Sequence, residues 1–214
     1  VWVISASRTG ASQFREKLIS INPATTPRVF TISALAYAML RTQAIHASAG
    51  EVNLKMLTGP QQEARIREIL ANSATNWPAK WKSALNTKVF ASDLRRWIDI
   101  NRATKQWHPD PALAKPLKDF VNILLTQAAA ATELSYTEAN LNATELLNSD
   151  EFVATKHFSP KAIIVDDLHD FDQSQLDLLV ALVKQTSYCF VTSNADAAVL
   201  SFRGVGIETT KRFQ

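Results

Sequence analysis

Two adjacent carboxylates, Asp166 and Asp167, are the residues of this sequence best suited to chemistry. They directly follow the apolar run Ala162 to Val165, which is typical of a strand buried on both faces of a parallel sheet. Open α/β sheets bind their ligands at the carboxyl ends of the strands. In that place one acid can hold a hydrated Mg²⁺ bound to nucleotide phosphates, and the next can orient an attacking water. The alternative is that the pair only closes a strand-to-helix turn.

The residues after the acids predict a helix and then a second strand. Asp172 and Gln175 have the spacing of a helix cap. One apolar helical face follows, at Leu176, Leu179, Val180 and Val183. The apolar run Tyr188 to Val191 predicts the next strand. The acids therefore belong to a strand–helix–strand unit and lie at its tip.

The first fifty residues predict a strand followed by a helix, twice over. Val1 to Ile4 is typical of a buried strand, and Pro27 to Ile32 predicts another, with Ser33 as a candidate cap for the helix behind it. The expected inward faces of the two helices are Phe14, Leu18 and Ile21, and Leu35, Ala36, Met39 and Leu40. Strands that alternate with helices predict an α/β fold with a parallel sheet.

The turn after the first strand contains Thr9-Gly10-Ala11-Ser12, which is similar to the end of a phosphate-binding loop. The lysine and the leading glycine of such a loop are both missing. We therefore do not expect this turn to cradle a triphosphate.

From Gly59-Pro60 to about Asn148 no segment has a strand pattern, which predicts an all-helical insertion. One helix is expected to begin at Pro60, and Pro109 and Pro111 mark a break between the second and third helices. The expected inward faces are Ile66, Ile69 and Leu70; Phe90, Leu94, Trp97 and Ile98; Leu113, Leu117, Phe120, Val121 and Leu124; and a weaker one within Leu141 to Leu147.

Residues 77–108 of this insertion mix basic and aromatic side chains. The segment contains Lys80, Lys82, Lys88, Arg95, Arg96, Arg102 and Lys105 against Asp93 and Asp99, with Trp77, Trp81, Trp97 and Trp107 interleaved. Such a segment can grip a phosphate backbone or stack on bases. The alternative is a solvated charged helix face with core tryptophans. We favour the alternative for Trp97, and for the lysines both interpretations stay open.

After the second strand of the acidic unit, a polar turn leads to Phe202 and Arg203. The phenylalanine could stack on a base and the arginine could reach a phosphate. A core phenylalanine and a surface arginine are the equally weighted alternative.

Composition and residue spacing argue against a membrane-spanning protein and against a zinc site. The chain has 214 residues, 46% of them hydrophobic, which is enough for a substantial core. Its net charge of +3 is too small to indicate nucleic-acid binding by itself. The single Cys189 lies in an apolar run, where we expect a core residue, and it fits a reducing compartment. No stretch is long and apolar enough to cross a membrane, and the four histidines lack the spacing of a zinc site.

Five segments, in order and spacing, resemble the UvrD/Rep class of superfamily 1 DNA helicases, and more narrowly the motor domains of actinobacterial helicase–nuclease proteins. They are Val3 to Leu18, similar to motif Ia; Arg28 to Arg41, similar to motif Ib; Leu57 to Gln62, similar to the "L-x-G-P-E-Q" that opens the helical insertion of the family; Val165 to Phe171, similar to Val-Asp-Glu-x-Gln-Asp; and Asn194 to Val205, similar to "D-P-D-Q-x-x-x-x-F-R-G-A". Together these segments cover nearly the whole chain.

The resemblance implies a partial RecA-like P-loop NTPase core, residues 1–50 and 157–214, with an inserted α-helical subdomain, residues 51–156. It implies ATP-dependent DNA unwinding in repair or recombination, with ATP and Mg²⁺ as cofactors of the full-length protein. The expected partners are single-stranded DNA and a second helicase–nuclease subunit, with no membrane, in a bacterial cytoplasm.

The resemblance also implies residue roles. Asp166 would bind Mg²⁺, and Asp167 stands where the family has a glutamate that orients the hydrolytic water. The expected contacts to single-stranded DNA are Ser7 and Arg8 in motif Ia, Thr31 and Ser33 in motif Ib, and Phe202 and Arg203 in motif III.

Several residues depart from the family pattern. Asp167 is one methylene shorter than glutamate, which would draw the base away from its water. His169 replaces a glutamine, Ala197 stands where many members have the glutamine that senses the γ-phosphate, and Leu200 stands where a tyrosine often stacks on DNA. A phosphate-binding loop is expected upstream of Val1 and a second motor lobe beyond the last residue, so the chain alone is predicted to be inactive.

Three hypotheses follow. The first is a segment of an ATP-dependent DNA helicase or translocase. The second is a degenerate motor that serves as a DNA-binding or subunit-docking scaffold, which the residues at 167 and 197 favour. The third, an unrelated α/β enzyme that uses the two acids, is the least supported.

Overall fold

The structure is a computed structural model, and it describes residues 1–24, 26–48, 53–72, 77–85, 87–106, 111–150, 152 and 157–194. The chain forms two compact units. The first comprises Val1–Val52 and Ala139–Gln214, and the second comprises Asn53–Glu138. The second unit therefore ends before residue 156, where the sequence analysis ended the insertion.

A four-stranded parallel sheet forms the centre of the first unit. Its strands are β1 (Trp2–Ser5), β2 (Arg28–Thr31), β5 (Ala162–Asp166) and β6 (Tyr188–Val191). Their order across the sheet is β2-β1-β5-β6, and each neighbouring pair is parallel. Strands from the first and last thirds of the chain thus share one sheet, which confirms the predicted α/β class with a parallel sheet.

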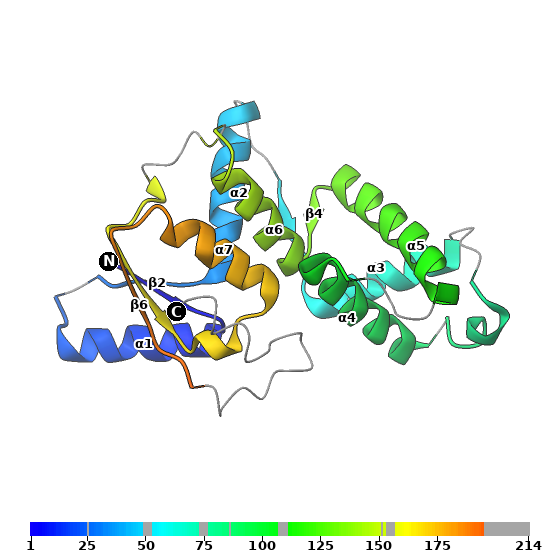
Figure 1. Ribbon diagram of the computed structural model, residues 1–214, viewed down its shortest axis with the longest axis horizontal. Helices are drawn as coiled ribbons and strands as arrows, with labels where there is room; N and C mark the ends of the chain where they lie inside the picture. The colour runs from blue at the N-terminus through cyan, green and yellow to red at the C-terminus, as the bar shows by residue number, and fades with distance from the viewer. Residues whose placement is uncertain are drawn as a thin grey trace. The chain divides into compact units, whose positions relative to one another are not determined.

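Helices cover both faces of this sheet (Figure 1). On one face lies α1 (Arg8–Ile21), and on the other lie α2 (Ile32–Ser48) and α7 (Gln173–Val183). Side chains alternate between the faces along each strand. Phe14 and Leu18 of α1 pack on Val3, Val29 and Ile164 of the three adjacent strands, together with Ala11. The fully buried side chains on the other side include Ile4, Ile163, Val165, Leu35, Met39, Leu176 and Leu179.

Three apolar side chains of the predicted elements are exposed. Ile21, expected on the inward face of the first helix, is 76% exposed at the end of α1. The strand β6 forms as predicted, but Tyr188 and Phe190 are 66% and 63% exposed because β6 is the last strand in the order of the described sheet. Cys189 between them is half-buried rather than a core residue.

The second unit is helical around its own core. Its main helices are α3 (Gly59–Asn72), α4 (Lys88–Thr104) and α5 (Pro111–Ala130), with a 3₁₀ turn, η1, at Ala79–Trp81. The buried cluster is Ile66, Ile69, Leu70, Trp77, Ala91, Leu94, Ile98, Leu117, Phe120 and Val121, which confirms most of the predicted faces. Of the other predicted positions, Leu113 is buried, whereas Phe90, Trp97 and Leu124 are only partly buried against the cluster. Next along the chain comes α6 (Tyr136–Leu147), which was also predicted.

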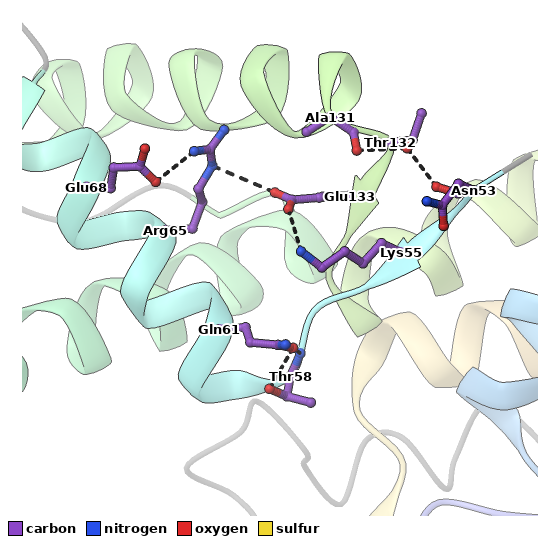
Figure 2. Close-up of polar contacts among 9 residues, drawn as sticks. All are labelled: Asn53, Lys55, Thr58, Gln61, Arg65, Glu68, Ala131, Thr132 and Glu133. Carbon is purple, nitrogen blue, oxygen red and sulfur yellow. Dashed lines mark hydrogen bonds and ion pairs between the residues drawn. The ribbon is translucent and has the colours of Figure 1, made fainter.

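The expectation that the segment from Gly59 to Asn148 has no strand is wrong. The short strands β3 (Lys55–Met56) and β4 (Glu133–Leu134) pair in parallel near the two ends of the second unit. Figure 2 shows Glu133 between two cations, 3.0 Å from Lys55 Nζ and 3.7 Å from Arg65 Nε. The Thr132 hydroxyl donates to the Asn53 carbonyl at 2.8 Å. These contacts join the start of the unit to its end.

In the part of the chain that the structure describes, no helix is long and apolar enough to cross a membrane.

Candidate functional site

Polar side chains line the carboxyl edge of the sheet. The strand register aligns Ser5, at the end of β1, with Thr31 of β2 on one side and Asp166 of β5 on the other. Residues in register on parallel strands project from the same face. Thr192 directly follows β6 and bonds to Asp166. Four strand ends therefore place hydroxyl and carboxylate groups in one row, at the edge where such sheets bind ligands.

The two acids occupy different positions in this row. Asp166 is half-buried, and its Oδ1 accepts a hydrogen bond from the Thr192 hydroxyl at 3.2 Å. Asp167 has φ 53° and ψ 56°, the left-handed region that aspartate tolerates better than most residues, and its side chain is 57% exposed. Its carboxylate makes no capping bond to the 3₁₀ turn η3 (Leu168–Asp170) that follows. Asp167 is thus exposed to solvent and Asp166 only partly, and the Asp167 carboxylate does not cap the turn.

The helix after the acids begins at a confirmed capping box. Asp172 Oδ1 accepts from the Gln175 amide, Gln175 Oε1 accepts from the Asp172 amide, and both distances are 3.0 Å. Asp172 Oδ1 also accepts from the Ser174 hydroxyl at 2.7 Å. The buried Asn140 side chain of α6 in turn donates to that hydroxyl at 3.0 Å. This series of hydrogen bonds fixes the start of α7. Through α7 it also fixes the end of the turn that contains the two acids, residues 166–170, which we call the acid turn.

His169 joins the acid turn to the segment after β6. The ring is 8% exposed, and its Nδ1 accepts a hydrogen bond from the Asn194 amide at 3.2 Å. An accepting Nδ1 assigns the proton of the neutral ring to Nε2. The carboxylates of Asp167 and Asp170 lie 4.0 and 3.9 Å from the ring nitrogens, too far for hydrogen bonds. The His169 ring therefore holds the backbone amide of Asn194.

Of the residues predicted to contact DNA, Ser7 and Arg8 are exposed at the start of α1. Ser7 caps that helix by accepting from the Gly10 amide at 3.0 Å. Thr31 is half-buried and accepts from the Ala34 amide at 3.2 Å, so it caps α2. The proposed cap, Ser33, is wrong: it lies inside α2 and is only 8% exposed.

Phe202 and Arg203, the remaining predicted DNA contacts, lie outside the described residues, as do Ala197 and Leu200.

Gly10 lies where α1 closely approaches the end of the first strand. A Cβ at this position would lie 2.5 Å from Ser5 Oγ and 3.2 Å from Ser7 Oγ. The Ser5 side chain is buried and its Oγ accepts from the Ser7 amide at 3.4 Å. The glycine thus serves a close helix–strand contact, whereas the sequence had only suggested an incomplete phosphate loop.

The basic segment of the second unit is partly neutralised within the unit. Arg95 pairs with Glu63 at 3.1 Å and with Asp99 at 3.3 Å, and Arg102 bonds both oxygens of Glu138 at 2.6 and 3.2 Å. Trp97 packs against the core, as predicted, and Trp77 is buried in it. The residues Lys82, Lys88 and Lys105 are exposed, whereas the side chain of Lys80 and the whole of Trp107 lie outside the described part.

Sequence reasoning missed Ser5, Thr192 and Asn194 as parts of the site. Each follows or ends a predicted strand, so its place at the carboxyl edge was available from the strand pattern. Which hydroxyl meets which carboxylate depends on the order β1-β5-β6, and no local pattern specifies that order.

The acids fit a magnesium ion shared with phosphates. Mg²⁺ is usually held by one or two carboxylates plus substrate phosphates and waters, not by a cage of protein ligands. Among the described residues no three His, Cys, Asp or Glu side chains gather into a metal-binding group. Asp166 has one oxygen engaged by Thr192, and its other oxygen would be the ligand for such an ion.

Comparison with known proteins identifies a family. The model of the UvrD/REP helicase N-terminal domain matches residues 1–214. No curated protein matches the chain. The match spans the parallel sheet, the acid pair and the inserted helical unit alike. The chain therefore belongs to the UvrD/REP helicase N-terminal domain family.

Proposed function

We propose that this chain is most of the first motor lobe of an ATP-dependent DNA helicase or translocase, acting in DNA repair or recombination. The observation that carries the proposal is the edge of the sheet where Asp166 and Asp167 end β5, beside the ends of β1 and β6. Family membership supports it, because the acids lie within the matched segment. The helical unit Asn53–Glu138 would be the inserted subdomain of that lobe.

In this proposal Asp166 holds Mg²⁺ and Asp167 orients the attacking water. The ion, when bound, neutralises charge on the nucleotide phosphates. The Asp166 side chain is half-buried and fixed by one hydrogen bond, which suits a ligand. The Asp167 side chain is exposed to water, but it is short by one methylene relative to glutamate.

Single-stranded DNA is the proposed partner. Ser7 and Arg8 are exposed at the amino end of α1, where backbone amides favour phosphate. Thr31 lies at the same edge of the sheet. Ser33 is buried, so we propose contact for it only through its backbone. Phe202 and Arg203 keep the DNA-contact role that the family resemblance implies.

A second helicase–nuclease subunit and a bacterial cytoplasmic location complete the proposal. Both rest on the resemblance of the five sequence segments.

The test is DNA-stimulated ATP hydrolysis by the natural protein that contains this chain, with Asp166→Ala as the baseline. We expect single-stranded DNA to raise the rate, and the substitution to lower it by about 100-fold or more, because a metal's charge stabilisation is worth several kcal/mol. Turnover no higher than that of the Asp166→Ala variant would reject the motor.

The scaffold alternative is favoured by two observations in the sequence, the aspartate at position 167 in place of glutamate and the alanine at position 197 in place of glutamine. Asp167→Glu restores the missing methylene. A motor that is slowed by its short base gains turnover in this variant, whereas a scaffold that lacks hydrolysis gains none. DNA binding that persists without turnover in both proteins would support the scaffold.

A further inference from the structure

The amide, the carbonyl and the hydroxyl of Thr192 all form hydrogen bonds with the segment that contains the two acids. Its amide donates to the Val165 carbonyl and its carbonyl accepts from the Leu168 amide, both at 2.9 Å. Its hydroxyl accepts from the Asp167 amide at 3.0 Å and donates to Asp166 Oδ1 at 3.2 Å. A hydroxyl has one donor and two acceptor sites, so it can make both bonds at once. One residue therefore contacts the turn from Val165 to Leu168 at four points.

The two backbone bonds fix where the hydroxyl lies. They continue the β5–β6 ladder past the pair Val165 and Val191. The β-branched side chain of threonine then has few rotamers. The hydroxyl is thus held in place before any ligand arrives, which is the condition for orienting a second group.

The hydroxyl constrains both acids at once. Its donor bond selects one orientation of the Asp166 carboxylate and leaves Oδ2 without a hydrogen-bond partner among the described residues. Its acceptor bond ties down the amide of Asp167, a residue whose left-handed backbone is otherwise unfavourable. Without the hydroxyl, the carboxylate of Asp166 would lose the hydrogen bond that selects this orientation.

We propose that Thr192 is a positioning residue whose hydroxyl fixes the Asp166 carboxylate and the Asp167 turn for binding a divalent cation. The inference rests on the proposed function, in which Asp166 is the metal ligand. It adds that the metal ligand is oriented by the neighbouring strand β6. Groups that orient metal ligands typically change metal affinity or activity by about 10- to 100-fold when removed.

The chain offers a matched pair of variants. Thr192→Val replaces the hydroxyl by a methyl group and keeps the β-branched shape and both backbone bonds. Thr192→Ser keeps the hydroxyl. Because Thr192 is exposed, neither variant alters the core. Unchanged exchange protection of the Leu168 and Thr192 amides shows that each variant keeps the ladder.

The first measurement, by NMR on this chain, tests the positioning itself. We expect Thr192→Val to lose exchange protection of the Asp167 amide and to average the χ1 couplings of Asp166, while Thr192→Ser retains both. Equal protection and equal couplings in the Val variant and the unsubstituted chain would overturn the inference.

The second measurement tests what the positioning serves. Mn²⁺ alone is titrated into the chain, and paramagnetic broadening is followed at the Asp166 and Asp167 amides. We expect affinity about tenfold lower in Thr192→Val and close to the original in Thr192→Ser. Equal affinity in all three proteins, or no broadening at the acids in the unsubstituted chain, would overturn the inference.

ATP hydrolysis by the natural protein separates this inference from the proposed function. If that protein hydrolyses no ATP, the proposed motor function fails, while the exchange, coupling and Mn²⁺ results still decide the role of the hydroxyl. If it does hydrolyse ATP, a lower kcat in Thr192→Val that Thr192→Ser restores supports the inference, and an unchanged kcat contradicts it.

Discussion

The capping box of α7 gives the sharpest prediction of stability, for the substitution Asp172→Ala. The lost cap costs about 1 kcal/mol. The Ser174 hydroxyl, whose side chain is fully buried, also loses the acceptor it donates to at 2.7 Å. A buried polar group left unsatisfied costs about 1–3 kcal/mol. The Ala variant should therefore be destabilised by about 2–4 kcal/mol.

Asp172→Asn is the matched control. Asparagine is as good an N-cap as aspartate, and its carbonyl oxygen can accept from both Gln175 and Ser174. We expect it to cost less than about 1 kcal/mol. Both variants lose the charge of the side chain, so the difference between them separates the loss of the capping group from the loss of charge.

Amide hydrogen exchange is the suitable assay, because it reports on α7 directly. Four of the five tryptophans lie at positions 77, 81, 97 and 107, so fluorescence would follow mainly the helical insertion. The amides of Leu176 to Leu182 should lose protection in the Ala variant and keep it in the Asn variant. Equal protection in both variants, or a loss below about 1 kcal/mol for Ala, would refute the account of the polar chain from Asp172 to Asn140.

Three further predictions concern other parts of the chain. Burial raises the pKa of the Cys189 thiol, so alkylation of Cys189 should reach its half-maximal rate at a higher pH than alkylation of a cysteine in an unfolded chain. The contribution of the thiol to stability should be fully present below the unfolded-state pKa and should fall as the pH rises through the folded-state pKa. A half-maximal alkylation rate at or below the pH found for the unfolded chain would contradict this. Replacing Lys80, Lys82 and Lys88 together by Ala should weaken DNA binding. It should also lower the slope of the logarithm of the DNA-binding constant against the logarithm of the salt concentration by up to about three units. An unchanged slope would show that these lysines form a solvated face. Glu133→Ala leaves Lys55 and Arg65 without their shared carboxylate, so the amides of the β3–β4 ladder should exchange faster by a factor of about 10. Unchanged exchange would show that the ladder alone joins the ends of the insertion.

Much of the sheet unit could be predicted because its signals are local. The apolar run Ala162 to Val165 followed by two acids specified a buried strand and its carboxyl end. The spacing of Asp172 and Gln175 specified the capping box, which the structure has in full. Periodic apolar faces specified the helices of the insertion, because burial along a helix repeats with the turn of the helix.

The features that were missed depend on contacts between distant segments. The strands β3 and β4 have two residues each, too few for any alternation to be seen. The exposure of Tyr188 and Phe190 follows from the place of β6 at the end of the described strand order, and an edge strand can have the same composition as a buried one. The cap of α2 is Thr31 rather than Ser33 because the helix begins two residues earlier than its polar residue suggested.

The candidate site was only half predictable for the same reason. Asp166 and Asp167 stand out by type and position. Thr192 does not stand out, because a threonine after a strand is common. Its part in the site depends on the strand register, which places it beside Asp166.

In the proposed function, the acids at the end of β5 face the metal of a bound nucleotide. Fe²⁺ in place of Mg²⁺, with ascorbate and peroxide, cleaves a protein backbone next to the ion. In the natural protein with ATP we predict cleavage beside Asp166 and Asp167 that requires the nucleotide and disappears in Asp166→Ala. Cleavage that maps elsewhere, or that persists at these residues without nucleotide, would contradict the account.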